Sequence, residues 1–269
     1  PTKDNQTSAS LNGYYCRTIT YIDNSINYEV CPNDDIAYKV GKTCAVFEKC
    51  FLNYHHTPLQ EVIPDFHNFK KRYTAFHQAL ESDPLNRAVQ CKEEISSFLK
   101  LEDNVCSFYE KSQMLPSRIC HNDPKLNNFL FAKDSLEPLA LIDLDTCMET
   151  GVVFDFGDMV RSVIVESAED CQNLELVSIN DNYFKRIAKG YLDNIGDLLT
   201  KGEKELLSLA PFAVSCVLGV RFLTDYLLGD RYFTVNFADH NLVRARVQLK
   251  AASLLLEKSS FYAKIIDNC

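Results

Sequence analysis

Apolar residues recur at helical spacing along most of the chain, and only a short central region departs from that spacing. Val40, Cys44 and Phe47 would share one face of a helix that runs to about residue 52, with Asp34 or Asp35 as its cap. The same periodicity predicts helices over about 68–80, 87–107, 155–167, 181–199, 203–228 and 240–266, the last with Asp239 as a cap. The pattern therefore predicts a mostly helical chain.

Strand patterns occur at two places. In the centre, Phe129–Phe131 and Leu139–Ile142 are short apolar runs on either side of a turn-like Lys133–Ser135 sequence. Near the start, Asn12–Gly13 is a strong hairpin signal and leads into Tyr14–Ile22, which has the composition of a strand. An isolated hairpin is hardly stable in water, so we expect it to pair with a sheet or to pack on the following helices. The predicted fold class is α+β, with a small β patch between helices.

Length, charge and cysteine content narrow the classes of protein that remain. The 269 residues suffice for one large domain or two modest ones, and 46% of them are hydrophobic. A net charge of −9 argues against a nucleic-acid partner, because such binding needs a basic surface. The 11 cysteines include no C-x-x-C pair, and Cys44, Cys106 and Cys216 lie in apolar helical patterns. Scattered cysteines of this kind indicate a reducing, cytoplasmic compartment and no zinc site.

The apolar segments do not suggest a membrane partner. Pro1–Ser10 is polar, so no signal peptide is predicted. The longest uncharged run, Leu206–Val220, is shorter than a membrane span and contains Pro211 and Gly219. A buried helix in a globular core is the better interpretation.

Polar residues concentrate at the central β patch. His121–Asn128 reads HNDPKLNN and precedes the first short strand, while Asp143 follows the second. Phosphoryl transfer needs a carboxylate beside the attacking hydroxyl and hard oxygen ligands that hold Mg²⁺ against the phosphates. In an H-x-D-x-x-x-x-N loop, Asp123 would orient and deprotonate the hydroxyl, while Asn128 and Asp143 would bind the metal. His121 would brace the loop by hydrogen bonding.

Each of these residues also has a purely structural interpretation. Asp and Asn in a turn most often bond the local backbone, and an acidic residue at a strand end is common. The order of this loop, two apolar strands, Asp143 and then Gly151-x-x-x-Asp155 is rare by chance, so we prefer the chemical interpretation for the set. Asp155 is predicted to brace the loop. The sequence assigns neither Asp145 nor Asp158 to the metal site.

Several segments resemble the aminoglycoside phosphotransferase and choline kinase superfamily, whose members are relatives of the protein kinases. The segments most similar to N-acetylhexosamine 1-kinases are HNDPKLNNFLF, ALIDLDT, DFGDMVRS, Ile63–His67 with Arg72, and GVRFLTDYLLGDRYF at 219–233. The resemblance implies a protein-kinase-like fold, mainly its helical C-terminal lobe with a small β patch at the catalytic loop. It also implies transfer of the γ-phosphate of ATP, with Mg²⁺, to the anomeric hydroxyl of N-acetylglucosamine or N-acetylgalactosamine.

The resemblance further implies roles for individual residues. Asp123 matches the catalytic aspartate, Asn128 a magnesium ligand, and Asp143 a metal ligand that also lies near the sugar. Arg221 and Tyr232 match positions that contact the sugar. A planar donor and an aromatic ring suit a sugar site.

The acceptor and the activity have alternatives. Arg221 could instead form an i,i+4 pair with Asp225, and Tyr232 could simply pack. The acceptor could be an aminoglycoside, choline or another small alcohol. The absence of Trp disfavours an aromatic cage for choline, and an Arg221 that faced the site would disfavour a polycation.

The start of the chain departs from the pattern of the superfamily. It has no glycine-rich phosphate loop and no V-A-I-K-like lysine. By the resemblance, residues 1–25 are a remnant of the nucleotide lobe, and 26–269 are the helical catalytic and substrate-binding lobe. Thr20, Tyr21 and Ile22 would lie in the hinge that lines the adenine pocket. We therefore expect residues 1–269 alone to bind ATP weakly and to turn over slowly.

Two other functions stay open. A non-catalytic pseudokinase would explain the missing nucleotide residues, but it has no need of Asp123, Asn128 and Asp143 together. A protein kinase is less favoured, because A-P-E and H-R-D are absent and Asn122 stands where the Arg of H-R-D would be.

Overall fold

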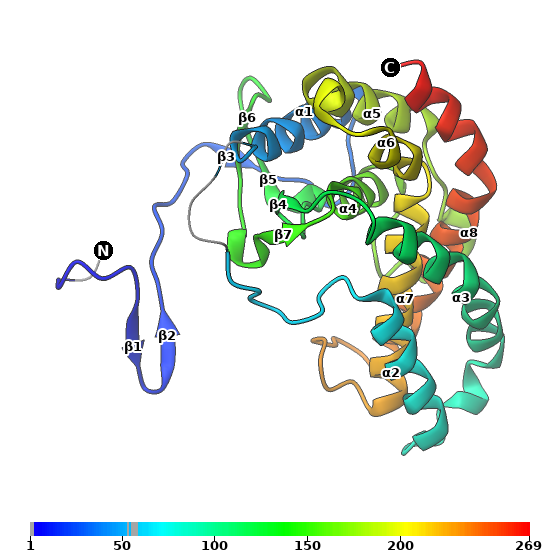
Figure 1. The fold of residues 1–269 in the computed structure, drawn as a ribbon. Helices are drawn as coiled ribbons and strands as arrows, with labels where there is room; N and C mark the ends of the chain where they lie inside the picture. Colours follow the sequence, from blue (N-terminus) through cyan, green and yellow to red (C-terminus); the bar gives the residue numbers. More distant parts are fainter. Residues whose placement is uncertain (1–2, 53, 55–58) are drawn as a thin grey trace.

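The computed structural model describes residues 3–52, 54 and 59–269, in which helices enclose a few short strands (Figure 1). The helices are α1 (Asp34–Cys50), α2 (Phe69–Ser82), α3 (Lys92–Ser112), α4 (Val152–Ile164), α5 (Asp181–Ile195), α6 (Lys201–Leu207), α7 (Ala210–Leu228) and α8 (His240–Asp267). The strands are β1 (Ala9–Leu11), β2 (Tyr14–Cys16), β3 (Ser25–Ile26), β4 (Arg118–Cys120), β5 (Phe129–Ala132), β6 (Pro138–Leu141) and β7 (Met148–Thr150). The α+β prediction is confirmed.

The strands form three small antiparallel sheets, β1–β2, β3–β5–β6 and β4–β7. β5 and β6 are the two predicted central strands. β3, β4 and β7 contain only two or three residues each, too few for a periodic pattern to be recognised in the sequence. They are held by pairing with strands that are distant in the chain.

The first two strands form the predicted hairpin. Asn12 and Gly13 have φ angles of 52° and 82°, the positive values that its two-residue turn requires. The prediction of a strand over 14–22 is wrong in length, because β1 offers three partners and β2 ends at Cys16. The hairpin projects from the helices (Figure 1), and Tyr15 is 89% exposed. It neither joins a larger sheet nor packs on the helices, contrary to expectation.

Local interactions explain where the observed helices differ from the predicted ones. Asn33 caps α1 in place of Asp34 or Asp35, since its side chain accepts hydrogen bonds from two backbone N–H groups of the first turn. The single helix expected over 203–228 is divided into α6 and α7, and Pro211 lies in the first turn of α7.

Three further helices differ from the prediction: α4 in its start, α8 in its cap and α3 in its end. α4 begins at Val152, three residues before Asp155. Asp239 precedes α8 but does not cap it; its carboxylate accepts a hydrogen bond from the hydroxyl of Tyr226 at 3.3 Å. α3 continues to Ser112, beyond the predicted end near residue 107.

α7 is the central helix of the fold and contacts α2, α3, α4 and α8 (Figure 1). Its length and composition would allow it to span a membrane, but 78% of its most apolar window is buried inside the protein. It is thus packed as a core helix, as expected for the run Leu206–Val220. All 11 cysteines are free thiols, and Cys44 and Cys216 are buried in this core.

α1 and α5 approach each other closely through two glycines. A Cβ atom added to Gly41 would lie 2.2 Å from the carbonyl oxygen of Ile187, and one added to Gly190 would lie 2.1 Å from that of Tyr38. Both neighbours are backbone atoms of helices, which cannot move aside locally. The pair of glycines therefore fixes the spacing of the two helices.

Gly190→Ala is expected to lower the free energy of unfolding by about 1–3 kcal/mol, because the added methyl group forces α1 and α5 apart. Gly196→Ala is the matched control, since its Cβ would meet only the Leu192 side chain at 3.6 Å. Urea unfolding of the two variants checks this. Equal stability of the variants would contradict the role of Gly190.

Candidate active site

The loop His121–Asn128 joins β4 to β5, and its backbone is held by a buried carboxylate. Asp155 in the first turn of α4 accepts hydrogen bonds from the backbone N–H groups of His121 and Asn122, both at 2.7 Å. Burial raises the pKa of the Asp155 carboxyl to about 7, although the two N–H bonds act in the opposite direction. Asp155 is fully buried, so this carboxylate fixes the start of the loop.

Asn122 bends the loop. Its φ of 69° is in the left-handed region, which Asn tolerates better than most residues. Its amide nitrogen donates to the carbonyl oxygens of Cys120, Thr146 and Met148, and its amide oxygen accepts from the Thr150 hydroxyl at 2.6 Å. Asn122 thereby ties β4 to β7. No pattern in the sequence predicts this role; the only signal is that Asn122 stands where protein kinases have the Arg of H-R-D.

His121 links the loop to the end of β6. Its Nδ1 accepts the backbone N–H of Asp123 at 3.2 Å, so Nε2 carries the proton and donates to the carbonyl oxygen of Ile142 at 2.9 Å. Burial lowers the pKa of the imidazole, which keeps it neutral. Both residues expected to brace the loop, His121 and Asp155, thus lie against its backbone.

Asp123 and Asn128 lie side by side. The amide nitrogen of Asn128 donates to the backbone oxygen of Asp123 at 2.8 Å and to its Oδ2 at 3.2 Å. Lys125 Nζ is 2.9 Å from the same Oδ2. No group in the described part of the chain donates to Asp123 Oδ1. That oxygen is available to a ligand.

Asp143 follows β6 in a left-handed conformation, with a φ of 64°. Its neighbour Ile142 donates its backbone N–H to the carbonyl oxygen of Asn128 at 2.9 Å, which brings the end of β6 to the loop. Asp143 is exposed and close enough to His121 for its charge to raise the pKa of that imidazole, against the larger effect of burial. The oxygens of Asn128 and Asp143 are hard ligands that suit Mg²⁺.

A cavity of about 60 Å³ lies beside the loop. It is lined by Phe66, His67, Phe69, Asn122, Asp123, Asp158, Arg161, Val214, Val217, Leu218 and Arg221. The structure therefore brings Arg221 of α7 to the same cavity as Asp123. Burial lowers the pKa of the Arg221 guanidinium, which lies 5.4–5.8 Å from the ring centroids of Phe66, Tyr232 and Phe233.

Tyr232 lies outside this cavity and is 69% exposed. Asp225 holds the segment that carries it: Oδ1 accepts the backbone N–H groups of Arg231 and Tyr232 and Oδ2 that of Phe233, all at 2.9 Å. The alternative pair of Arg221 with Asp225 is not formed, because Asp225 has these partners instead. Asp225 thus sets Tyr232 beside Arg221.

The other predicted positions lie apart from this cavity. Thr20 and Tyr21 are exposed, and Ile22 is half-buried with its carbonyl oxygen bonded to the Ser25 hydroxyl at 2.7 Å. Arg17, in the same segment, pairs with Asp145. Asp158, by contrast, lines the cavity and pairs there with Arg161.

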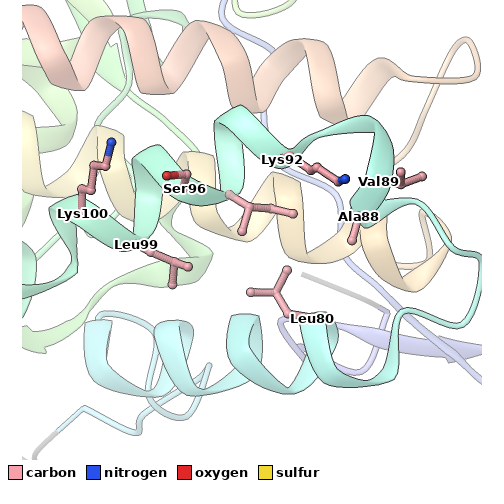
Figure 2. Close-up of a pocket in the computed structure, with 8 residues that line it drawn as sticks. Leu80, Ala88, Val89, Lys92, Ser96, Leu99 and Lys100 are labelled. Carbon is pink, nitrogen blue, oxygen red and sulfur yellow. The ribbon is translucent and has the colours of Figure 1, made fainter.

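The most voluminous of the described cavities, about 790 Å³, lies between α2 and α3 (Figure 2). Leu80 of α2 faces Leu99 of α3 across it, and its only charged residues are Lys92 and Lys100. It has no carboxylate and none of the predicted site residues, so its volume does not make it the reacting centre.

Comparisons with known proteins concern the family and the fold of the chain. A sequence model of the phosphotransferase enzyme family matches residues 4–192. An ethanolamine kinase from Plasmodium vivax is similar in structure, with a TM-score of 0.56 and 13% identity over 87% of this chain and 65% of that kinase. The chain thus spans just under two thirds of that kinase. This likeness confirms the predicted protein-kinase-like fold.

Two more solved structures are similar. A choline kinase from Cryptosporidium parvum has a TM-score of 0.49 and 15% identity, over 84% of this chain and 67% of its own. An ADP-bound aminoglycoside phosphotransferase, APH(2'')-Ib, has a TM-score of 0.46 and 12% identity, over 92% of this chain and 76% of its own.

The buried Asp155 should give the protein a characteristic pH dependence. Its pKa is about 7 in the folded chain and about 3.9 when unfolded, so the native state binds the extra proton between these values. The stability of the wild type relative to Asp155→Asn is therefore expected to fall as the pH rises from about 4 to 7. Urea unfolding at several pH values measures this, with the exposed Asp103→Asn as control. A relative stability that rises with pH would contradict it.

Proposed function

Because the chain belongs to the phosphotransferase enzyme family, we propose that it transfers the γ-phosphate of ATP to a hydroxyl of a small molecule. The arrangement of Asp123 carries this proposal. Lys125 and Asn128 hold its Oδ2, while Oδ1 has no partner in the described chain. A carboxylate that is fixed at one oxygen and free at the other can orient an attacking hydroxyl and accept its proton.

We propose Asn128 and Asp143 as the magnesium ligands. They offer an amide and a carboxylate oxygen from adjoining segments, which the backbone bond between Ile142 and Asn128 holds together. Mg²⁺ bound there would neutralise charge on the phosphates of ATP. Thr20, Tyr21 and Ile22 stay our proposal for the adenine contact, which rests on sequence resemblance.

For the acceptor we propose an N-acetylhexosamine, phosphorylated at its anomeric hydroxyl. Support comes from Arg221, which shares a cavity with Asp123 and lies near the rings of Phe66 and Tyr232. A half-buried guanidinium in the same cavity as Asp123 disfavours a cationic acceptor such as an aminoglycoside. Ethanolamine and choline are the second candidates, because proteins with those activities share this fold or resemble it.

We also infer a reducing, cytoplasmic location and a small-molecule partner, with no nucleic acid and no membrane. The scattered cysteines and the net charge of −9 support this setting.

Asp123→Asn is expected to lower the rate of phosphoryl transfer by about 10²–10⁴-fold, because the amide cannot accept the proton of the hydroxyl. The measurement is ADP release with Mg²⁺ and ATP across N-acetylglucosamine, N-acetylgalactosamine, glucosamine, ethanolamine, choline and kanamycin. The protein should be expressed with any residues that precede Pro1 in its gene. The change replaces one oxygen by an isosteric nitrogen, so the fold should be retained.

Each result has a distinct meaning. Turnover of the N-acetylated sugars that is lost in Asp123→Asn would support both the chemistry and the acceptor. Turnover restricted to choline, ethanolamine or kanamycin would keep the chemistry and overturn the proposed role of Arg221. Folded protein without turnover of any acceptor would favour the pseudokinase.

A further inference from the structure

In the part of the chain that the structure describes, two buried polar atoms that have no hydrogen-bond partner belong to residues lining the cavity beside Asp123. They are Asp158 Oδ2 and His67 Nε2. Asp158 is only 6% exposed, and its other oxygen, Oδ1, accepts a hydrogen bond from Arg161 Nε at 2.7 Å. Buried polar atoms in native proteins are nearly always hydrogen-bonded. Because both residues line one cavity, a ligand in that cavity is the natural hydrogen-bond partner of these two atoms.

The side chains of Asp158 and His67 are both fixed by contacts with neighbouring residues. Arg161, whose side chain is 11% exposed, contacts Asp158 through Nε and through Nη2 at 2.5 Å. The ring of His67 stacks on that of Phe154, with 4.5 Å between centroids and 2° between planes. Neither group needs to be ordered when a ligand binds, which favours affinity.

The charges of the cavity select the kind of ligand group. Asp123 and Asp158 oppose Arg161 and Arg221, and burial, together with the charge of Arg221, lowers the pKa of His67 to about 3, so its imidazole is neutral. A cation would be repelled by the guanidinium groups and an anion by the carboxylates. A neutral hydrogen-bond donor, a hydroxyl or an amide N–H, avoids both repulsions and suits Asp158 Oδ2.

We propose that Asp158 determines acceptor specificity by accepting a hydrogen bond from a second, neutral donor of the acceptor, distinct from the hydroxyl that is phosphorylated. This inference rests on the proposed phosphotransferase function and narrows its acceptors to polyhydroxylated or amide-bearing molecules. Choline has one hydroxyl and no other donor, so it cannot make this contact. His67 Nε2 supplies a further hydrogen bond on the same wall.

The cavity volume limits how the acceptor enters. About 60 Å³ is far below the roughly 300 Å³ of a small ligand pocket, so the cavity admits one edge of a sugar. That edge carries the reacting hydroxyl toward Asp123 and the second donor toward Asp158. The rest of the sugar lies outside, on the side where Tyr232 is exposed.

The test combines a variant with altered acceptors. We would measure kcat, KM and the calorimetric Kd for N-acetylglucosamine and its singly deoxygenated analogues, in the wild type and in Asp158→Asn. Loss of a hydrogen bond to a charged group predicts that one analogue binds the wild type about 10- to 100-fold more weakly. Asp158→Asn should bind the parent sugar more weakly by a similar factor and should not discriminate against that analogue.

Arg161→Gln is the structural control, since it breaks the same ion pair and leaves the carboxylate in place. It should lower the melting temperature as Asp158→Asn does, yet still discriminate against the analogue. If each analogue bound more weakly than the parent sugar by the same factor in the wild type and in Asp158→Asn, the proposal would be overturned. Asp158 would then be a structural residue.

Failure of the proposed function is a separate result. Sugar binding that Asp158→Asn weakens, without any turnover by the wild type, would overturn phosphoryl transfer and support the binding role of Asp158. Absence of both binding and turnover in folded wild type would overturn both.

Discussion

The position of the loop His121–Asn128 depends on one buried carboxylate, that of Asp155, which accepts hydrogen bonds from two consecutive backbone N–H groups. A carboxylate in an apolar interior is unstable unless it is hydrogen-bonded, and these two N–H groups have no other partners in the described structure. Each side therefore stabilises the other. Movement of the loop would leave an unsolvated acid and two unpaired donors inside the protein. The same bonds place Asp123 and His121 relative to the start of α4.

The helices behind this contact form a second buried network. Glu48 of α1 is buried near Asp155, and its Oε2 accepts a hydrogen bond from the Tyr191 hydroxyl at 2.6 Å. Burial, and then the charge of Asp155, raise the pKa of Glu48 well above its usual value. Tyr191 lies on α5, one residue after the Gly190 that lets α5 approach α1. The close contact between α1 and α5 therefore also brings the Tyr191 hydroxyl within hydrogen-bond distance of Glu48. Both interactions lie behind α4 and the loop.

Sequence patterns anticipated the parts of this arrangement that are local. Helical periodicity predicted the positions of the helices. Two short apolar runs on either side of a turn sequence predicted β5 and β6. The strands β4 and β7 were not anticipated, because three residues carry no period and their stability comes from pairing across 28 to 32 residues of chain. The alternative pairing of Arg221 with Asp225 does not form for a similar reason: the three backbone N–H partners of Asp225 come from the turn that follows α7, a geometry that i,i+4 spacing does not contain. The role of a residue is therefore hard to predict from one sequence when its partners are distant in the chain.

The acceptor that we propose depends on the cavity beside Asp123, to which both the core helix α7 and the loop contribute residues. A charge removed from water is tolerated only beside a compensating charge or donor, so Arg221 and Asp158 constrain whatever enters between them. An acceptor with a single hydroxyl would contact Asp123 but leave Asp158 Oδ2 without a hydrogen bond. The missing hydrogen bond would lower the affinity for that acceptor. A sugar edge presents neighbouring hydroxyl or amide groups in a fixed geometry and meets both carboxylates at once. On this proposal, the charged groups that line the cavity favour a polyhydroxylated acceptor over an amino alcohol.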